Sequence, residues 1–404
     1  MTSIRVLYFH QYFNTPEMGG STRSYETSTR LAKMGFDVTI ITTLRDKKIS
    51  ENLVVEKING VTIYWLNIPY SNKMNFVRRV LAFLQFAFKS LRVGSKINAD
   101  VIFASSTPLT VAIPALYCNW KNRIPLIFEV RDLWPNIPIA MGVIKNPLIK
   151  WLAESLEMIT YKNSSKIVAL SPDMKSYIVN LGISEDKIIV VPNAADFDLF
   201  QNIELFGPSF RNKKGIKDDT IVVLYAGTFG NVNGCEYIVK LAALLNDCNV
   251  CFVMLGEGKE KEMLLEIAEN AGVLNKNIFF YPQISKSQIP EVFRSADLVI
   301  STIINVQALE ANSANKVFDG LAAGRGVIIN HGGWIADFLK QSKAGIQLSW
   351  DISTAANELR GLIVNKQRIL EMGINAKNLA KEKFNRDTLT NEIAEVIKSV
   401  YKAN

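Results

Sequence analysis

The sequence predicts two Rossmann-like, doubly wound α/β domains that face each other across a cleft, with additional helices at the C-terminus. Short runs of β-branched and aromatic residues alternate with helical segments, which is typical of βαβ units in a parallel sheet. This alternation occurs twice, and an unpatterned polar stretch separates the two sets. The chain has 404 residues, enough for two domains of about 200 residues each. Its 48% hydrophobic and 21% charged residues exclude disordered, collagen-like and disulfide-rich chains.

The first domain is predicted over residues 1–200. Its strands are expected at Ile4–Phe9, Asp37–Thr42, Val61–Leu66, Val101–Ala104, Pro125–Phe128 and Lys166–Leu170. A helix is expected over Thr22–Met34 with Ser21 as its N-cap, because a serine hydroxyl can accept a hydrogen bond from the first turn. A second helix is expected over Ser71–Lys96.

A linker is predicted over residues 201–218, followed by the second domain over residues 219–385. Strands are expected at Ile221–Tyr225, Val250–Met254, Ile278–Tyr281, Leu298–Ser301 and Gly326–Asn330. Helices alternate with them, for example Lys259–Asn270 and Ile289–Arg294, and only helices are expected after Asp351. The last helix, residues 386–404, is expected to pack back on the first domain.

Composition and charge bear on the location of the protein. Four cysteines without a signal-peptide pattern fit a reducing cytoplasm. No run reaches about 18 uninterrupted apolar residues, so no membrane-spanning helix is expected. Residues 1–195 hold 23 Lys and Arg against 14 Asp and Glu, whereas the remainder holds 23 against 24. The basic first half indicates an anionic partner, with charge for solubility alone as the alternative.

The helix expected at residues 71–96 combines basic side chains with a Phe-rich apolar face and has no acidic residue. Such a helix fits an anionic membrane surface, where its contacts would be Arg78, Arg79, Lys89 and Arg92. The alternative is a core helix with a basic polar face. Nucleic acid is not expected as a partner, since the stretch lacks the strands of a base-stacking sheet.

The loop after the first strand contains Gly19, Gly20, Ser21 and Arg23. Paired glycines just before a helix let backbone amides approach an anion, so this loop is a candidate phosphate or acceptor site. A tight turn is the alternative. The loop lacks the GxGxxG pattern of dinucleotide-binding enzymes.

Three charged residues, Glu129, Arg131 and Asp132, follow the strand that ends at Phe128. The carboxyl ends of parallel strands are where doubly wound folds bind ligands. We therefore predict catalytic roles for Glu129 and Asp132 and acceptor binding by Arg131, with a surface ion pair as the alternative.

Two glycine-rich loops in the second domain each join a strand to a helix. The first contains Gly227, Thr228 and Gly230, and the second contains Gly256 and Gly258. Their backbone N–H groups could approach a diphosphate, although plain turns are the alternative. Neither loop is followed by the Gly-Lys-Ser/Thr of a P-loop.

Lys316 and Asp319 lie three residues apart, on one face of a predicted helix. A lysine there could bind a phosphate and a carboxylate could accept hydrogen bonds from ribose hydroxyls, whereas a surface ion pair is the alternative. Gly332 and Gly333 follow the next strand and are also candidates for donor binding.

Three other motifs are expected to carry no chemistry. Asp196–Asp198 reads DxD but lies away from the carboxyl end of any strand, so a structural turn is expected. Cys248 and Cys251 form a CxxC without a second pair. His10 and His331 are the only histidines, so no metal site is expected.

The ordered set of motifs resembles family 4 retaining glycosyltransferases, which have the GT-B fold. The segment Val191–Phe200 is similar to the family's VPNGVD…F motif. Other matching segments are Gly19-Gly20, Leu170–Pro172, Gly256–Gly258 and Lys316–Gly324. Arg131–Pro135 resembles a narrower branch, the bacterial O-antigen and capsule transferases of the fucosaminyl type.

The resemblance implies a nucleotide-sugar donor on the second domain, an acceptor on the first domain, and retention of configuration without a metal. It places Asp319 at the second Glu of the family's E-x7-E motif, near the ribose, and Lys316 at the donor phosphates. The chain departs from the family at three points. Ala311 stands where the first Glu would fall, with Glu310 one position away. Thr228 and Asn233 lie near the usual Arg and Lys, and Gly326 replaces a Pro.

These observations predict a cytoplasmic glycosyltransferase, peripheral on the inner face of the membrane. It would move a sugar, with deoxy-amino sugars as one candidate class, from a nucleotide diphosphate to a lipid-linked oligosaccharide. A UDP-sugar is favoured, and no cofactor or metal is expected. A nucleotide-sugar 2-epimerase on the same fold and a degenerate nucleotide-binding module are the alternatives.

Overall fold

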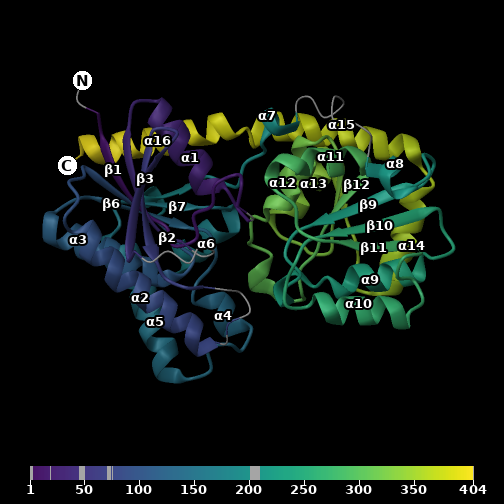
Figure 1. Ribbon diagram of the computed structural model, residues 1–404, viewed down its shortest axis with the longest axis horizontal. Helices are drawn as coiled ribbons and strands as arrows, with labels where there is room; N and C mark the ends of the chain where they lie inside the picture. The colour runs from purple at the N-terminus through teal and green to yellow at the C-terminus, as the bar shows by residue number, and fades with distance from the viewer. Residues whose placement is uncertain are drawn as a thin grey trace.

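The computed structural model describes residues 3–18, 20–44, 51–70, 74, 76–200 and 210–403. Two α/β domains lie side by side along the long axis of the molecule (Figure 1). The fold class predicted from the alternating pattern is confirmed. Gly19 and the predicted linker residues 201–209 lie outside the described ranges, as do residues 71–73 of the predicted basic helix.

The first domain is built on an eight-stranded sheet with the order β3-β4-β2-β1-β5-β6-β7-β8. All neighbouring strands are parallel except β3, which pairs antiparallel with β4. The strands are β1 Arg5–Phe9, β2 Asp37–Leu44, β3 Leu53–Ile58, β4 Val61–Asn67, β5 Val101–Ser105, β6 Leu126–Val130, β7 Lys166–Ala169 and β8 Ile188–Val190. The order reverses at β1, so the loop after β1 lies at a topological switch point.

Helices cover both faces of this sheet, because successive side chains of each buried strand point to opposite sides. Leu7 and Phe9 of β1 pack in one core with side chains of helices α2, α3, α5 and α6. Val6 and Tyr8 pack in the other core with α1 and α16. These helices, with the short α4 and α7, are α1 Arg23–Lys33, α2 Phe76–Gly94, α3 Ala112–Asn122, α4 Asn136–Ala140, α5 Pro147–Asn163, α6 Pro172–Asn180, α7 Phe197–Phe200 and α16 Arg386–Lys402.

The second domain has a six-stranded, all-parallel sheet with the order β11-β10-β9-β12-β13-β14. Its strands are β9 Ile221–Ala226, β10 Val250–Leu255, β11 Ile278–Tyr281, β12 Leu298–Ser301, β13 Gly326–Ile329 and β14 Gly345–Gln347. Its helices are α8 Phe210–Lys214, α9 Glu236–Leu244, α10 Lys261–Asn270, α11 Ile289–Ser295, α12 Asn315–Ala322, α13 Trp334–Ser342, α14 Ile352–Ile363 and α15 Lys366–Lys383. The switch point lies between β9 and β12, beside the first glycine-rich loop.

Three strands are absent from the sequence prediction. β8 and β14 have only three residues each, too few to show a period of two. β3 forms a hairpin with β4 through Asn59 and Gly60, which have φ values of 48° and 86°. An Asn-Gly pair with both residues at positive φ is the turn that a two-residue hairpin prefers, so the signal for β3 was present in the sequence.

Two local predictions are wrong. Helix α1 begins at Arg23 with Thr22 in the N-cap position and no side-chain cap, so Ser21 is not the N-cap. The Ser21 hydroxyl accepts hydrogen bonds from the Arg23 N–H at 3.5 Å and from Arg131 at 3.0 Å. The strand expected to end at Phe128 continues for two more residues as β6, so Glu129 lies within the strand and does not follow it.

Helix α16 returns from the second domain to the first and is visible as the yellow helix beside α1 (Figure 1). Asp196, 7% exposed, fixes the start of this helix. Its two carboxylate oxygens pair with Arg386 at the start of α16 and with Lys286 of the second domain. Ala195 N–H also donates to Phe384 O at 2.8 Å. Asp196 therefore has a structural role, as the join between three segments that are distant in the sequence.

We predict that Asp196→Ala lowers the free energy of unfolding by about 3–5 kcal/mol, because it leaves two cations unpaired in a buried environment. Burial alone would raise the pKa of Asp196, but Arg386 and Lys286 hold it below its usual value. Its contribution is therefore complete above the ordinary carboxyl pKa and is lost as the pH falls through the lowered one.

Urea denaturation near pH 7 and at acid pH measures this effect. Asp198→Ala is the matched control, since that side chain is 78% exposed and its ion pair with Arg30 spans 4.0 Å. Equal stability of the two variants would contradict the structural role of Asp196.

Candidate active site

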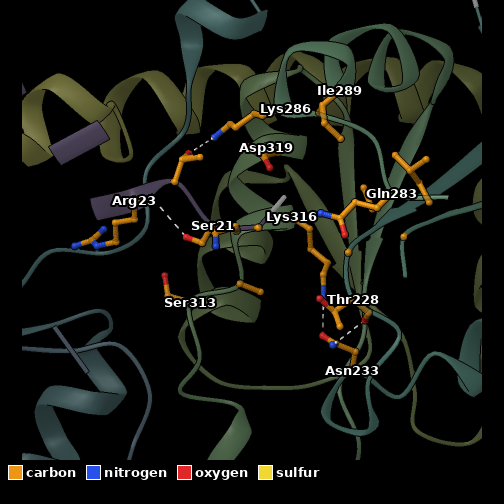
Figure 2. Close-up of a pocket in the computed structure, with 18 of the residues that line it drawn as sticks. Ser21, Arg23, Thr228, Asn233, Gln283, Lys286, Ile289, Ser313, Lys316 and Asp319 are labelled. Atoms are coloured by element: carbon orange, nitrogen blue, oxygen red, sulfur yellow. Dashed lines mark hydrogen bonds between the residues drawn. The ribbon is translucent and has the colours of Figure 1, made fainter. Parts of the chain in front are cut away.

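A cavity of about 380 Å³ lies between the two domains. The first domain lines it with the loop after β1 and the loop after β6, and the second domain with the loops after β9, β10, β11 and β12 and the start of α12 (Figure 2). The two switch points thus face the same cavity. Of the predicted site residues, those that line it are Gly20, Ser21, Arg23, Arg131, Asp132, Gly227, Thr228, Gly256, Lys316 and Asp319.

Lys316 is the central cation of the second-domain wall. Its Nζ donates to Asn233 Oδ1 at 2.9 Å and lies 4.8 Å from the centroid of the Tyr225 ring (Figure 2). Desolvation lowers the pKa of Lys316 to about 8. The ammonium group is therefore mostly protonated at neutral pH, without a carboxylate partner among the groups that shift its pKa. An anionic ligand would supply the missing negative charge.

Asn233 holds this lysine in place. Its Nδ2 donates to Thr228 O at 3.0 Å, and the Tyr225 hydroxyl donates to the same carbonyl at 2.8 Å. The loop after β9 is thereby folded onto its own strand, with the Asn233 amide oxygen toward Lys316. No local pattern indicates this role, because it depends on contacts between residues 83 positions apart.

Asp319 lies one helical turn after Lys316 and lines the same cavity. Burial raises its pKa to about 6, partly offset by Lys286. The carboxylate is the main form at pH 7, and a half-buried carboxylate that makes no ion pair within the described part of the chain favours a ligand that donates hydrogen bonds. Ribose hydroxyls are donors of this kind.

Glycines allow the two loops of the second domain to touch. A Cβ on Gly256 would lie 1.8 Å from Gly227 O, and a Cβ on Gly258 would lie 2.1 Å from Phe229 O. The N–H groups of Gly227 and Phe229 donate to Leu255 O and Glu257 O. These two amides therefore hold the loops together and are not available for a phosphate. Gly230 and Gly258 do not line the cavity.

Gly332 and Gly333 also lie outside the cavity lining. The N–H of Gly332 donates to Glu310 Oε1 at 3.4 Å, and the N–H of Trp334 donates to Asp173 Oδ2 of the first domain at 3.1 Å. The start of α13 is thus already occupied by carboxylates of the protein. This geometry does not favour the donor-binding role predicted for the two glycines.

Arg23 and Glu129 form a buried ion pair in the first domain. Arg23 Nε and Nη2 lie 3.0 and 2.9 Å from Glu129 Oε1, and Ser105 Oγ donates to the other oxygen. Desolvation would raise the pKa of Glu129, but the Arg23 and Arg131 guanidinium groups hold it below its usual value. Glu129 does not line the cavity. The structure therefore places it as a partner of Arg23, which does not favour the predicted catalytic role.

Arg131 and Asp132 face the cavity from the loop after β6. Arg131 Nη2 donates to Ser21 Oγ at 3.0 Å, and Thr107 Oγ1 donates to Asp132 Oδ2 at 2.7 Å. The cavity walls thus combine cations and carboxylates: Arg131 and Asp132 with Arg23 on the first domain, and Lys316 and Asp319 with Lys286 on the second.

Comparison with known proteins agrees with this architecture. Residues 18–199 match the model of "Glycosyltransferase Family 4" and residues 208–398 match that of "Glycosyl transferases group 1". Together these matches cover both domains. The chain belongs to the family 4 glycosyltransferases.

Individual relatives of this glycosyltransferase are distant. A putative colanic acid biosynthesis glycosyl transferase of Escherichia coli is 22% identical over 228 residues, which are 54% of this chain and 55% of that protein. An uncharacterized glycosyltransferase of Methanocaldococcus jannaschii is 24% identical over 389 residues, 91% of each chain. The structure of Anabaena HepE in complex with UDP and glucose superposes with a TM-score of 0.71 at 16% identity, covering 98% of this chain and all of HepE.

Lys286 is a cavity residue of the glycosyltransferase that sequence reasoning missed. Its Nζ donates to Thr22 Oγ1 at 3.1 Å and pairs with Asp196, so it links the second domain to the first loop of the first domain (Figure 2). A lysine in a polar loop carries no sequence signal for this role, because its partners lie 264 and 90 residues away.

The predicted basic helix corresponds to α2. Its inner side, with Phe83, Phe86 and Ala87, belongs to the core. Large apolar side chains on its outer side are exposed, and neighbouring helices add more. They are Val77, Leu81 and Phe88 on α2, Trp120 on α3, and Leu148, Ile149, Trp151, Leu152 and Ile159 on α5. We call this set the apolar face. No described helix is long and apolar enough to cross a membrane.

We predict that Glu129→Gln destabilises the glycosyltransferase by about 3–5 kcal/mol, because Arg23 would lose its charged partner in a buried site. Thermal and urea unfolding measure this loss. The activity per folded molecule should fall by less than tenfold, since Glu129 is outside the cavity lining. Normal stability together with a large loss of turnover would instead restore the catalytic role.

Proposed function

We propose that this glycosyltransferase moves a sugar from a UDP-sugar to a lipid-linked oligosaccharide, with retention of configuration at the transferred carbon. The observation that carries the proposal is the placement of Lys316 and Asp319, a half-buried lysine and a half-buried carboxylate one helical turn apart, on one wall of the interdomain cavity. A cation for a diphosphate and an acceptor for ribose hydroxyls are the two groups that a nucleoside diphosphate needs.

The second domain would hold the donor. Lys316 would bind the diphosphate and stabilise the charge that develops on the β-phosphate as the sugar leaves. Asp319 would accept hydrogen bonds from the ribose. The choice of UDP is supported by the HepE complex with UDP and glucose, whose fold is similar. Deoxy-amino sugars remain one candidate class for the transferred group.

The first domain would hold the acceptor. Its hydroxyl would attack the anomeric carbon on the same side as the leaving diphosphate. The bond from that carbon to the β-phosphate oxygen breaks, a glycosidic bond to the acceptor oxygen forms, and the hydroxyl proton passes to the departing phosphate. Asp132 would orient the hydroxyl, and Arg131 would bind a phosphate of the acceptor. Such a step needs no enzyme nucleophile.

We also propose that transfer needs no metal, since Lys316 supplies the positive charge at the phosphates. The side chains that could act as metal ligands are consistent with this proposal. Within the ranges that the structure describes, no three His, Cys, Asp or Glu side chains gather as metal ligands. Titration of the protein with UDP in EDTA tests directly whether donor binding needs a metal.

A bacterial surface polysaccharide is the proposed product, supported by the colanic acid relative. The acceptor would be lipid-linked at the inner face of the membrane. The apolar face together with the basic side chains of α2 supports peripheral binding there, because anionic headgroups attract the cations while exposed aromatic side chains enter the interface.

The structure favours neither alternative. A 2-epimerase would use acid–base groups around the sugar, but His331 does not line the cavity and its Nδ1 lies 2.7 Å from Gly332 O. A degenerate module would be supported only if the donor site failed to bind nucleotide.

We predict that UDP binds without metal, and that Lys316→Met weakens binding roughly 30-fold or more, because a desolvated ion pair is lost. Calorimetric titration with UDP, GDP and ADP in EDTA measures this. Lys381→Met, on an exposed position of α15, is the matched control. Affinity should fall above about pH 8, where Lys316 loses its proton, and below about pH 6, where Asp319 gains one.

Failure of all three nucleotides to bind, with or without Mg²⁺, would contradict the donor site and favour the non-catalytic module. Consumption of a UDP-sugar to an isomeric sugar without acceptor would favour the epimerase.

We predict that the protein binds vesicles containing phosphatidylglycerol more tightly than neutral vesicles, and that salt weakens the binding. Phe88→Ser combined with Trp151→Ser should weaken it about tenfold or more, because both side chains are more than half exposed on the apolar face. Val364→Ser with Leu370→Ser, equally exposed on the second domain, is the control pair for co-sedimentation. An equal effect of the two pairs would contradict the proposed membrane surface.

A further inference from the structure

We propose that His10 is the positioning residue of Arg131, holding its guanidinium in the cavity wall through a neutral imidazole of one tautomer. This inference rests on the acceptor-binding role of Arg131 proposed above. It gives a function to a histidine that the sequence analysis set aside.

His10 directly follows β1 at the topological switch point and is buried, with 1% of its surface exposed. Its Nε2 lies 3.0 Å from Arg131 Nη1, and its Nδ1 lies 2.8 Å from Ser24 Oγ on α1. The ring stacks against Tyr8, with centroids 6.2 Å apart. The loop after β6, helix α1 and the Tyr8 ring of β1 therefore each contact the imidazole.

The chemistry of the partners assigns the proton. A guanidinium can only donate hydrogen bonds, so His10 Nε2 must accept one and carry no proton. The neutral ring then bears its proton on Nδ1 and donates it to Ser24. Arg131 Nη2 is held in turn by Ser21 Oγ at 3.0 Å. Two acceptors thus fix the orientation of the guanidinium beside Asp132.

Charged and titratable groups near His10 come from the elements packed around it. Tyr8 on β1 and Arg131 in the loop after β6 contact the ring. Glu129 on β6 belongs to the same buried cluster, because Ser105 Oγ bonds both the Tyr8 hydroxyl and Glu129, and Glu129 pairs with Arg23 on α1. Arg23 and Glu129 are already paired with each other. A proton on Nε2 would remove the acceptor for Arg131 and place two cations side by side, so acid pH should release the guanidinium.

The first test needs no ligand. Because the chain has only two histidines, ¹⁵N-histidine NMR with His331→Gln for assignment reports His10 alone. The expected spectrum shows the neutral ring of His10 with Nδ1 protonated and Nε2 unprotonated. In Arg131→Ala, His10 should populate both neutral tautomers. A protonated ring or the opposite tautomer would overturn the inference, whatever the ligand results.

The second test uses geranyl diphosphate as a soluble lipid-diphosphate probe, titrated with the donor site saturated by UDP. Arg131→Ala and His10→Ala should each weaken binding about tenfold, the loss expected for a hydrogen bond to a charged group. His10→Gln offers an acceptor near the position of Nε2 and should restore affinity to within about threefold. It should also remove the loss of affinity at acid pH that we expect for the wild type.

The outcomes separate the two proposals. Loss of binding in Arg131→Ala with unchanged binding in His10→Ala overturns the positioning role alone. Unchanged binding in Arg131→Ala overturns the acceptor role of Arg131 and the inference with it. The melting temperatures of His10→Ala and His10→Gln are the control for folding. Equal values show that a difference in binding between the two variants does not come from a folding defect.

Discussion

The buried carboxylate of Asp196 is the interaction on which the arrangement of the two domains depends. It pairs with Arg386 of α16 and with Lys286 of the second domain, and Lys286 also reaches Thr22 in the first loop. Three segments far apart in the sequence therefore meet at one charge. Because a buried carboxylate is costly unless it is paired, the pairs constrain the domains to the relative position that forms the cavity.

The second constraint is the balance of charge within that cavity. Lys316 is desolvated and is held by an amide oxygen rather than by a carboxylate. Asn233 thus supplies a neutral holder for the lysine, while Lys286 adds a second cation to the same wall of the cavity. We expect the affinity of the donor site for a diphosphate to depend on the protonation states of both Lys316 and Asp319. The first-domain wall follows a similar plan, with Arg131 held by the neutral groups Ser21 and His10.

Much of the fold followed from the sequence. The apolar runs located eleven of the strands, and the glycine-rich loops and Lys316 were recognised from residue type and position. The missed strand β3 had its Asn-Gly turn signal, whereas β8 and β14 are too short to have one. The candidate site was predicted in part. Lys316, Asp319, Arg131 and Asp132 line the cavity, whereas Glu129, Gly332 and Gly333 lie outside its lining. Glu129 is paired with Arg23, and the N–H of Gly332 donates to Glu310.

The sequence by itself determined the two parallel sheets, the position of their switch-point loops and the residue types that those loops carry, since these depend on local periodicity and on the order of strands. Only the tertiary structure decided which side chains are partners. The pairs Arg23–Glu129, Lys316–Asn233 and His10–Arg131 join residues 83 to 121 positions apart. Their bonds depend on distances of about 3 Å between separate elements, and no local pattern in the chain encodes such distances.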